Sequence, residues 1–407
     1  MATLVRRRAF NPAVALVLLL GASVILNYID RGALGVAAPV MKSDLRLSAT
    51  AFGLAVSGFF WIYAPIQLIL GWLCDRLSVY RLFVFGTVLW SVCTLSMGFV
   101  GGFLSLFILR LMLGVGESIA FPGSSKLICR HVPPERRGLA NAVVAAALAL
   151  GPAIGTLLGG SIVAAFGWRT MFVVFGIASA IWLVPWQRVV SALPTDRNVT
   201  EASFAVRKVT GRRSLWSMGV AHFCCNFGFY FLLAWLPLYL VQQRGLTIIG
   251  MTMLATVGYA VQAGAAIALG SVSDRWTQSG RSEAAIRRWM MIVGQLVFGA
   301  CIVGIFMAHS LFAIALLLSI AGICIAAGSL NLYAVAQMFA GPRASGTWVG
   351  IQNSIGNVAG IIGPVVCGIL IDRAGYAGAF MLTATITAFG GLWWAFGIPD
   401  IEQIELG

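Results

Sequence analysis

Long apolar stretches alternate with short polar segments along almost the whole chain. Stretches of about 20 apolar residues, enough to cross a hydrocarbon core about 30 Å thick, recur twelve times. We place the predicted spans at residues 14–36, 51–73, 82–100, 103–125, 139–164, 168–188, 214–240, 249–270, 289–308, 311–339, 346–370 and 376–397. The pattern therefore predicts an all-α membrane protein with twelve transmembrane helices.

The longest polar break in this pattern lies between the sixth and seventh spans and runs from residue 187 to residue 213. It divides the chain into two predicted bundles of six helices, residues 1–186 and 214–407, joined by a linker at 187–213. The first apolar stretch has no small-residue cleavage site after it, so we expect it to remain as the first helix.

Composition changes the picture little but excludes a soluble globular protein. Hydrophobic residues make up 60% of the chain and charged residues 10%, with a mean hydropathy of +0.93. Eight cysteines show no Cys-x-x-Cys spacing, so we expect free thiols and no metal site. No phosphate-binding loop or nucleophile constellation is present, and we expect neither an enzyme with catalytic residues nor a cofactor.

The net charge of +14 is a signal of membrane topology. When the loops are assigned alternately to the two faces, most basic residues gather on one side. The other side receives only Lys42, Arg46, Arg169, Arg244 and Arg373. The positive-inside rule then places both termini and the linker in the cytoplasm. We expect a monomeric multi-pass protein of the cell's inner (plasma) membrane, in contact with the lipid bilayer and with no nucleic-acid partner.

Four charged residues fall inside predicted spans of the first half, where they are costly. They are Asp30 and Arg31 in the first span and Arg110 and Glu117 in the fourth. A charge in the middle of a membrane costs from about 2.5 to over about 10 kcal/mol, depending on the reference state, so retained charges indicate function. Ion or proton coupling is the first hypothesis, and a static network that only ties the first helix to the fourth is the alternative.

Helix geometry suggests how these charges are arranged. Arg110 and Glu117 are seven residues apart and share one face, whereas Asp30 and Arg31 point about 100° apart. Our hypothesis is that Arg31 faces a central cavity and binds a substrate carboxylate. Asp30 is then expected to pair with Arg110 and to take up a proton when that pair breaks. Glu117 has no cation on its own helical face within one turn, so we expect it to be protonated at rest.

A short motif recurs at the ends of spans and relates the two halves. Gly71-x-x-x-Asp75-Arg76 ends the second span, and Gly270-x-x-x-Asp274-Arg275 ends the eighth. A third copy, Gly368-x-x-x-Asp372-Arg373, ends the eleventh span on the outer side, as inverted three-helix repeats would require. We expect the glycines to let helices approach closely and the aspartates to cap helix ends, which makes these residues gating elements.

These motifs resemble the signature of the major facilitator superfamily over essentially the whole chain. Within it, four segments resemble the anion:cation symporter family: Asn27-Tyr28-Ile29-Asp30-Arg31, Ser57 to Tyr63, Gly114 to Pro122 and Phe229 to Pro237. The resemblance implies two six-helix bundles around a central cavity and transport of organic anions, many of them sugar acids. It also implies that Asp30 and Glu117 carry protons and that Arg31 binds the anion. We add Arg110 to this coupling group as the expected partner of Asp30.

Neutral polar residues in the spans are candidates for contacts to the substrate. We assign this role to Tyr28, Tyr63, Gln67, Tyr230, Asn353 and Asn357. Tyr230 and Asn353 correspond to positions of the family's pattern, and Asn353 and Asn357 share one helical face. Hydrogen bonding between helices is the alternative role for each of them.

One departure widens the substrate class. The fifth span is nearly all Ala, Val, Leu and Gly where sugar-acid carriers place polar residues, which favours a less hydroxylated anion. We therefore predict proton-coupled symport of an organic anion, with sodium as the alternative coupling ion. The competing hypotheses are a proton-coupled antiporter that exports amphipathic compounds and a sensor built on a transporter fold. Arg31 and Arg110 favour anions over the cations that such exporters carry.

Overall fold

The computed structural model describes residues 12–132, 134–193 and 209–403, and these residues form helices joined by short turns. The helices of the first half are α1 (Pro12–Asp44), α2 (Ala49–Arg76), α3 (Val79–Met97), α4 (Phe103–Glu117), α5 (Ala120–His131), α6 (Pro134–Ile181) and α7 (Leu183–Ser191). Those of the second half are α9 (Arg213–Gln242), α10 (Ile248–Gln278), α11 (Glu283–Met307), α12 (Leu311–Ala374) and α13 (Tyr376–Phe396). Most of the predicted linker, residues 194–208, lies outside the described residues.

Eleven stretches of the described chain are long and apolar enough to cross a membrane, against the twelve that we predicted. The difference lies at the fifth and sixth predicted spans, which form one continuous stretch of 46 residues, Ala146–Ser191. Inside this stretch Gly167 has φ 83° and ψ 164°, a backbone conformation that breaks a helix and that glycine adopts without strain. At 1.5 Å per residue the stretch is about 69 Å long, more than twice a hydrocarbon core.

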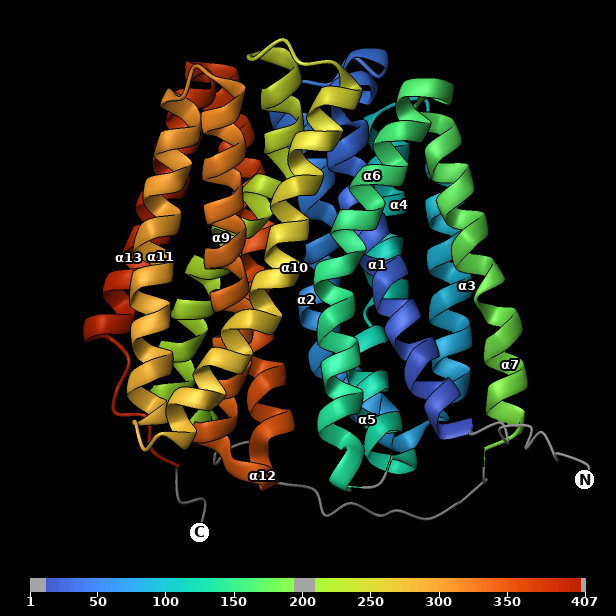
Figure 1. The fold of residues 1–407 in the computed structure, drawn as a ribbon. Coiled ribbons are helices and arrows are strands. Elements are labelled where there is room, and N and C mark those ends of the chain that lie inside the picture. The colour runs from blue at the N-terminus through green and yellow to red at the C-terminus, as the bar shows by residue number, and fades with distance from the viewer. Residues whose placement is uncertain (1–11, 133, 194–208, 404–407) are drawn as a thin grey trace, which may run out of the picture.

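The helices pack as two bundles that lie side by side, α1 to α7 and α9 to α13 (Figure 1). Three helix pairs join the bundles: α1 with α9, α2 with α12, and α6 with α10. We call the surface formed by these three pairs the interface between the halves. The start of α1 and the last described residues after α13 lie at one end of the molecule, and the loops after α1 and α9 lie at the other. We refer to these as the terminal end and the far end.

Side-chain caps fix where several helices begin. Ser48, Thr247, Ser282 and Ser310 precede α2, α10, α11 and α12, and each accepts a hydrogen bond from the backbone N–H three residues on. Such caps satisfy one of the four N–H groups that a helix start leaves without a partner. The Ser and Thr residues of these polar loops therefore determine where the helices begin.

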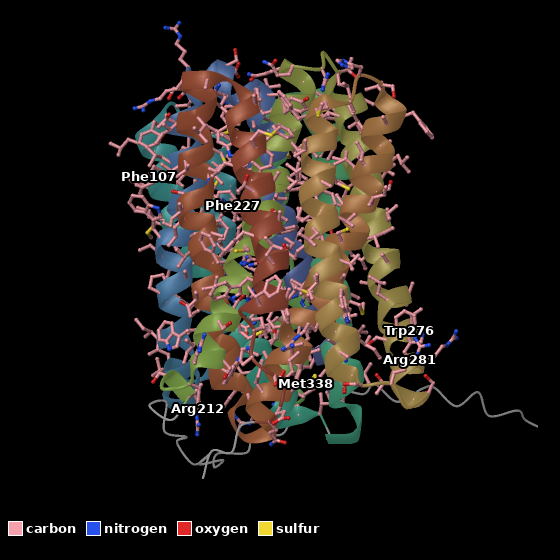
Figure 2. All side chains as sticks on the ribbon, turned by 90° about the vertical axis from the view of Figure 1, so that its left-hand side faces the viewer. Phe107, Arg212, Phe227, Trp276, Arg281 and Met338 are labelled. Carbon is pink, nitrogen blue, oxygen red and sulfur yellow. The ribbon has the colours of Figure 1, made fainter. Side chains whose placement is uncertain are left out.

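Apolar side chains cover the outside of the bundles, as expected for a surface in contact with lipid. Phe85, Phe166, Ile267 and Phe312 are between 63% and 79% exposed. Figure 2 shows side chains projecting along the whole length of the bundle, with Arg212 and Arg281 near the terminal end. The protein is a multi-pass membrane protein of the all-α class.

Close approach of the halves depends on glycines in the far half of the interface. A Cβ atom on Gly35 would collide with the Leu233 carbonyl, and one on Gly368 would lie 2.5 Å from the Ala49 carbonyl oxygen. The predicted close packing is therefore present at Gly368. At Gly270, none of the heavy atoms of the described residues lies within 4 Å of the position a Cβ would take, so they show no such close packing there.

Candidate functional site

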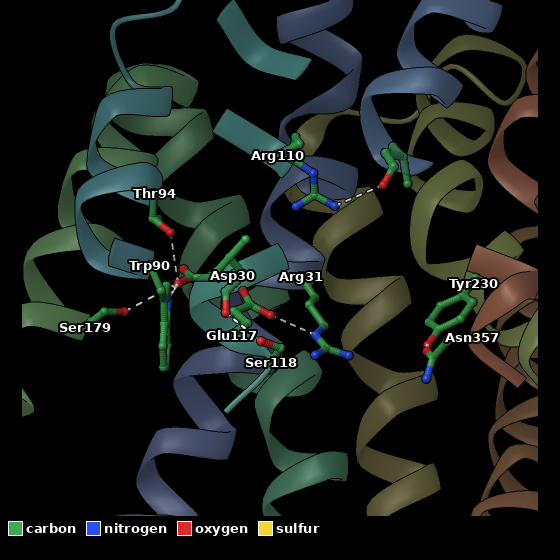
Figure 3. Close-up of polar contacts among 12 residues, drawn as sticks. Asp30, Arg31, Trp90, Thr94, Arg110, Glu117, Ser118, Ser179, Tyr230 and Asn357 are labelled. Atoms are coloured by element: carbon green, nitrogen blue, oxygen red, sulfur yellow. Dashed lines mark hydrogen bonds and ion pairs between the residues drawn. The ribbon is translucent and has the colours of Figure 1, made fainter. Parts of the chain in front are cut away.

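The four intramembrane charges of the first half are all buried. Their exposed fractions are 3% for Asp30, 6% for Arg31, 2% for Arg110 and 0% for Glu117. They lie on α1 and α4, and Figure 3 shows them in one region of the bundle, with the Arg31 side chain on the side of Tyr230 and Asn357. Burial makes every partner of these groups important, because an unpaired buried charge is costly.

Arg31 and Glu117 form a direct ion pair between α1 and α4. The Arg31 Nε atom donates to the Glu117 Oε2 atom at 3.0 Å. Glu117 has no cation within one turn on its own helix, but the neighbouring helix α1 supplies one, which removes the reason for expecting Glu117 to be protonated at rest. The pair is incomplete, since Arg31 Nη2 and Glu117 Oε1 are buried without a hydrogen-bond partner.

Aromatic rings surround the Arg31 guanidinium on several sides. Its Cζ atom lies 4.9 Å from the ring centres of Tyr28 and Phe59 and 4.3 Å from that of Tyr63. A cation over a ring face is attracted by about 0.5 to 2 kcal/mol, more when water is excluded. These rings hold the guanidinium in place while leaving part of its fork of donors unpaired.

The position of Glu117 follows from a break in the fourth transmembrane segment. Helix α4 ends at Glu117 and α5 begins at Ala120, although the apolar span continues to Ile128. Pro122 lies just beyond the break, and it has no N–H to bond the carbonyl of Ser118 four residues earlier. The Glu117 carboxylate thus lies at a helix end inside the membrane.

Asp30 points away from Arg31, toward α3 and the second part of α6. Its Oδ2 atom accepts hydrogen bonds from Trp90 Nε1, from Thr94 Oγ at 3.2 Å and from Ser179 Oγ at 3.4 Å (Figure 3). The expected ion pair with Arg110 is wrong, because neutral donors of the outer helices occupy this carboxylate. Thr87, Ser91 and Thr94 form a stripe of polar residues at helical spacing in the third span. This stripe is the feature of the sequence that points to a polar contact on this face of the helix.

Arg110 is bound by backbone groups of α2. Its Nε and Nη2 atoms donate to the carbonyls of Ala55 at 3.3 Å and Val56 at 3.2 Å, and its Cζ atom lies 5.0 Å from the Phe59 ring centre. Figure 3 shows its guanidinium well separated from Asp30. In this arrangement Arg110 fixes α4 against α2.

The neutral candidates of the second half bond to one another and to α2. Tyr230 donates its hydroxyl to Asn357 Oδ1 at 2.6 Å, and Asn357 Nδ2 donates to the Asn353 carbonyl at 2.8 Å. Asn353 Nδ2 donates across the interface to Gln67 Oε1 at 3.0 Å. The Tyr230 ring also packs on Phe60, 4.6 Å between centres. Four of the six predicted contact residues are thus buried at the interface or against Arg31: Tyr63, Gln67, Tyr230 and Asn357. Asn353 and Tyr28 are partly buried, and Tyr28, on α1, joins the others through the Arg31 guanidinium.

The gating motifs are described to different extents. The side chains of Asp75, Arg76 and Asp274 and the surroundings of Gly71 are not among the described parts of the chain, and Arg275 is exposed at the end of α10. The third copy is fully placed. Asp372 of α12 accepts hydrogen bonds from the backbone N–H groups of Ala49 at 2.8 Å and Thr50 at 2.7 Å, at the start of α2. This contact caps a helix of the opposite half.

Comparison with known proteins adds to this geometry. The chain matches the profile of the Major Facilitator Superfamily over residues 20–282 and 279–403. It is 30% identical to the hexuronate transporter of Bacillus subtilis over 397 residues, which cover 90% of each chain. It is also 30% identical to the probable sulfoacetate transporter of Cupriavidus necator, over 90% of this chain and 89% of that one.

A further relative is the probable galactarate/D-glucarate transporter of Bacillus subtilis, 28% identical over 94% of this chain and 90% of the relative. Among solved structures, a bacterial homologue of the human lysosomal transporter Spinster, inward-facing and unoccupied, superposes with a TM-score of 0.82. The alignment covers 97% of this chain and 98% of that one at 17% identity. At this identity the likeness describes the fold.

Proposed function

The chain belongs to the Major Facilitator Superfamily of secondary transporters, and on this premise we propose that it takes up a small organic anion, such as a sugar acid or another carboxylate, together with a proton. The relatives support this class of substrate, because hexuronate, galactarate, glucarate and sulfoacetate are all anions at neutral pH. We further propose that both termini are cytoplasmic, as the basic loops predict.

The observation that carries the proposal is the buried ion pair between Arg31 and Glu117. While Glu117 is ionised, it occupies the donor that an incoming carboxylate needs. Adding the anion without a proton would leave two carboxylates on one buried guanidinium, at a high electrostatic cost. Protonation of Glu117 removes one negative charge and frees the Arg31 Nε donor. Anion binding and proton binding therefore favour one another, which is the requirement for symport.

Arginine suits the proposed ligand. Its planar fork presents paired donors to a carboxylate and keeps its charge when buried. The Nη2 group without a partner is available before Glu117 is displaced. Tyr230, Asn353 and Asn357, together with Tyr63 and Gln67 of α2, line the same interface and are placed to bond the hydroxyls or second carboxylate of a substrate.

Asp30 is the second proposed proton carrier. Its Oδ1 atom is buried and has no partner, while Oδ2 is held by neutral donors. Because no cation pairs with this carboxylate in the described structure, a proton is the simplest compensation for its charge. We propose that Arg110 has a positioning role: its hydrogen bonds to the α2 backbone hold α4, and with it Glu117, at a fixed place beside α2.

The test is the internal pH of proteoliposomes that contain the purified protein. Sugar acids, sulfonates, short carboxylates and cationic amphiphiles are added outside, and uptake of the active compound is followed with a radiolabel. We expect an anion to acidify the lumen. In Glu117→Gln we expect acidification to be lost while exchange of labelled for unlabelled anion persists, because the neutral amide imitates the protonated acid.

Glu283→Gln is the matched control, since Glu283 pairs with Arg287 near the terminal end of α11, away from the charge group. Unchanged acidification in Glu117→Gln would show that the ion pair is only structural. Alkalinisation of an acid-loaded lumen by a cation would overturn symport in favour of an antiporter. Uptake that follows a sodium gradient and not a proton gradient would show that the coupling ion is sodium.

A further inference from the structure

Asp30 lies behind α1 as seen from the interface between the halves. Arg31 points toward Tyr230, whereas Asp30 points to Trp90 and Thr94 of α3 and to Ser179 of α6 (Figure 3). All three of these partners belong to the first half. A proton that reaches Asp30 from water therefore needs a route that differs from the path of the substrate along the interface.

Buried polar groups without partners continue from Asp30 toward the terminal end. Both amide atoms of Asn27, the Ser91 hydroxyl and the Thr87 hydroxyl are buried and make no hydrogen bond to any of the residues that the structure describes. The exposed fractions of the three residues are 0%, 4% and 1%. Buried polar groups are nearly always hydrogen-bonded, and internal water is the usual partner where the protein supplies none.

Helix geometry places these groups together. Helices α1 and α3 both run from the terminal end to the far end, and the bonds of Trp90 and Thr94 to Asp30 fix their relative height. Asn27 is three residues before Asp30, or about 4.5 Å nearer the terminal end, and Ser91 is the same step before Thr94. Thr87 lies one further turn along the same face of α3.

We propose that Asn27, Ser91 and Thr87 hold ordered water that relays protons to and from Asp30 on its terminal-end side, inside the first half and apart from the substrate. Beyond Thr87 the buried apolar residues Phe83 and Val79 of α3 follow, so the relay extends over the polar part of this face. In each transfer a water accepts a proton from one neighbour and gives one to the next, and the last proton adds to Asp30 Oδ1. The charged groups that act on Asp30 include Arg110 and Glu117 of α4, and Arg31 is its neighbour in the sequence. This inference rests on the proposed coupling to protons.

The test removes each polar group with little change of shape, in Thr87→Val, Ser91→Ala and Asn27→Leu. Two rates are compared in proteoliposomes loaded with the active anion. Exchange of labelled for unlabelled anion moves the loaded carrier back and forth and needs no release of the Asp30 proton, whereas net uptake does. We expect net uptake and lumen acidification to fall at least about tenfold while exchange changes less than about twofold.

Thr256→Val is the matched control, because Thr256 Oγ is another buried hydroxyl without a partner, on α10 of the second half. We expect it to leave both rates unchanged. The apparent melting temperature in detergent gives a readout independent of transport. If the route holds water, the three variants lose bonds to that water and do not become more stable. If the groups lie in a dry site, removing a hydroxyl without a partner raises the melting temperature.

Two outcomes would overturn the inference. Equal loss of exchange and net uptake would mean that the groups only support the fold, and higher stability with unchanged net uptake would mean that no water is bound. Failure of the proposed function is distinguished from failure of this inference by measuring lumen acidification with the wild-type protein. If no anion acidifies the lumen of the wild type, the coupling is wrong before any variant is measured.

Discussion

Asp372, the last acidic residue of α12, holds the first turn of α2 through Thr50. The Asp372 Oδ2 atom accepts from the Thr50 N–H at 2.7 Å, and its Oδ1 atom accepts from the neighbouring Ala49 N–H. The two residues belong to different halves and lie at the far end. A carboxylate at a helix start meets both the free N–H groups and the positive end of the helix dipole. This contact fastens the far end in its closed arrangement.

Asp372→Asn is expected to loosen that closure. The amide keeps at most one acceptor and loses the negative charge, a cost of about 1 kcal/mol for an exposed carboxylate at a helix start. The population with the far end open should then rise about fivefold. Distances between spin labels at Ser43 and Ala374, measured by pulsed electron resonance, report this change. Asp400→Asn, at the terminal end, is the control, and an unchanged distance distribution would contradict the predicted role.

Arg31→Lys is expected to weaken binding of the anion by about 10- to 100-fold, or about 1.4 to 2.7 kcal/mol. Lysine keeps the charge but presents a single ammonium group without a planar fork, and it packs less well among the three rings around Arg31. Equilibrium binding of the labelled anion to purified protein measures the change. Arg244→Lys, in the loop after α9, is the matched control. Equal affinities of wild type and Arg31→Lys would remove Arg31 from the binding site.

Tyr230→Phe separates hydroxylated from simple anions. The variant removes the hydroxyl that donates to Asn357 at 2.6 Å and keeps the ring that packs on Phe60. If the two side chains bind substrate hydroxyls, affinity for sugar acids should fall about fivefold, from the loss of about 1 kcal/mol of hydrogen bonding. Affinity for short carboxylates without hydroxyls should stay the same. Competition against one labelled anion compares both classes in a single assay, and a uniform loss for both would indicate a purely structural bond.

His131, at the end of α5, is expected to make stability depend on pH. Partial burial lowers the pKa of His131 below its ordinary value of 6.5, and the positive charge of Arg130 lowers it further. The unfolded chain therefore binds a proton more readily than the folded protein does in this range. The contribution of His131 is fully present above pH 6.5 and is lost as the pH falls through its lower value in the folded protein.

The measurement is the apparent melting temperature in detergent between pH 8 and pH 5. We expect the wild type to lose more stability over this interval than His131→Phe, which has no titrating ring at the Tyr80 contact. His309→Phe, in the loop before α12, serves as control. Identical pH profiles for wild type and His131→Phe would show that His131 contributes nothing to this dependence.

The sequence by itself determined the architecture and the identity of the charged residues. A membrane leaves few ways to satisfy the backbone, so apolar stretches of sufficient length are helices, and basic loops indicate their orientation. The count differed only at Ala146–Ser191, one apolar stretch that the kink at Gly167 divides into two helical parts. Asp30, Arg31, Arg110 and Glu117 stood out because the cost of a charge in the membrane depends on its presence in a span and not on its neighbours.

Only the tertiary structure decided which of these charges pair. Spacing along one helix relates residues of that helix, but Arg31 meets Glu117 from another helix, and Asp30 meets neutral donors of α3 and α6 in place of Arg110. The rotation of each helix about its axis sets these contacts, and it follows from packing of whole helix surfaces at close approaches such as Gly35 on Leu233. The same reason applies to Asp372, whose partner on α2 lies 322 residues away in the sequence.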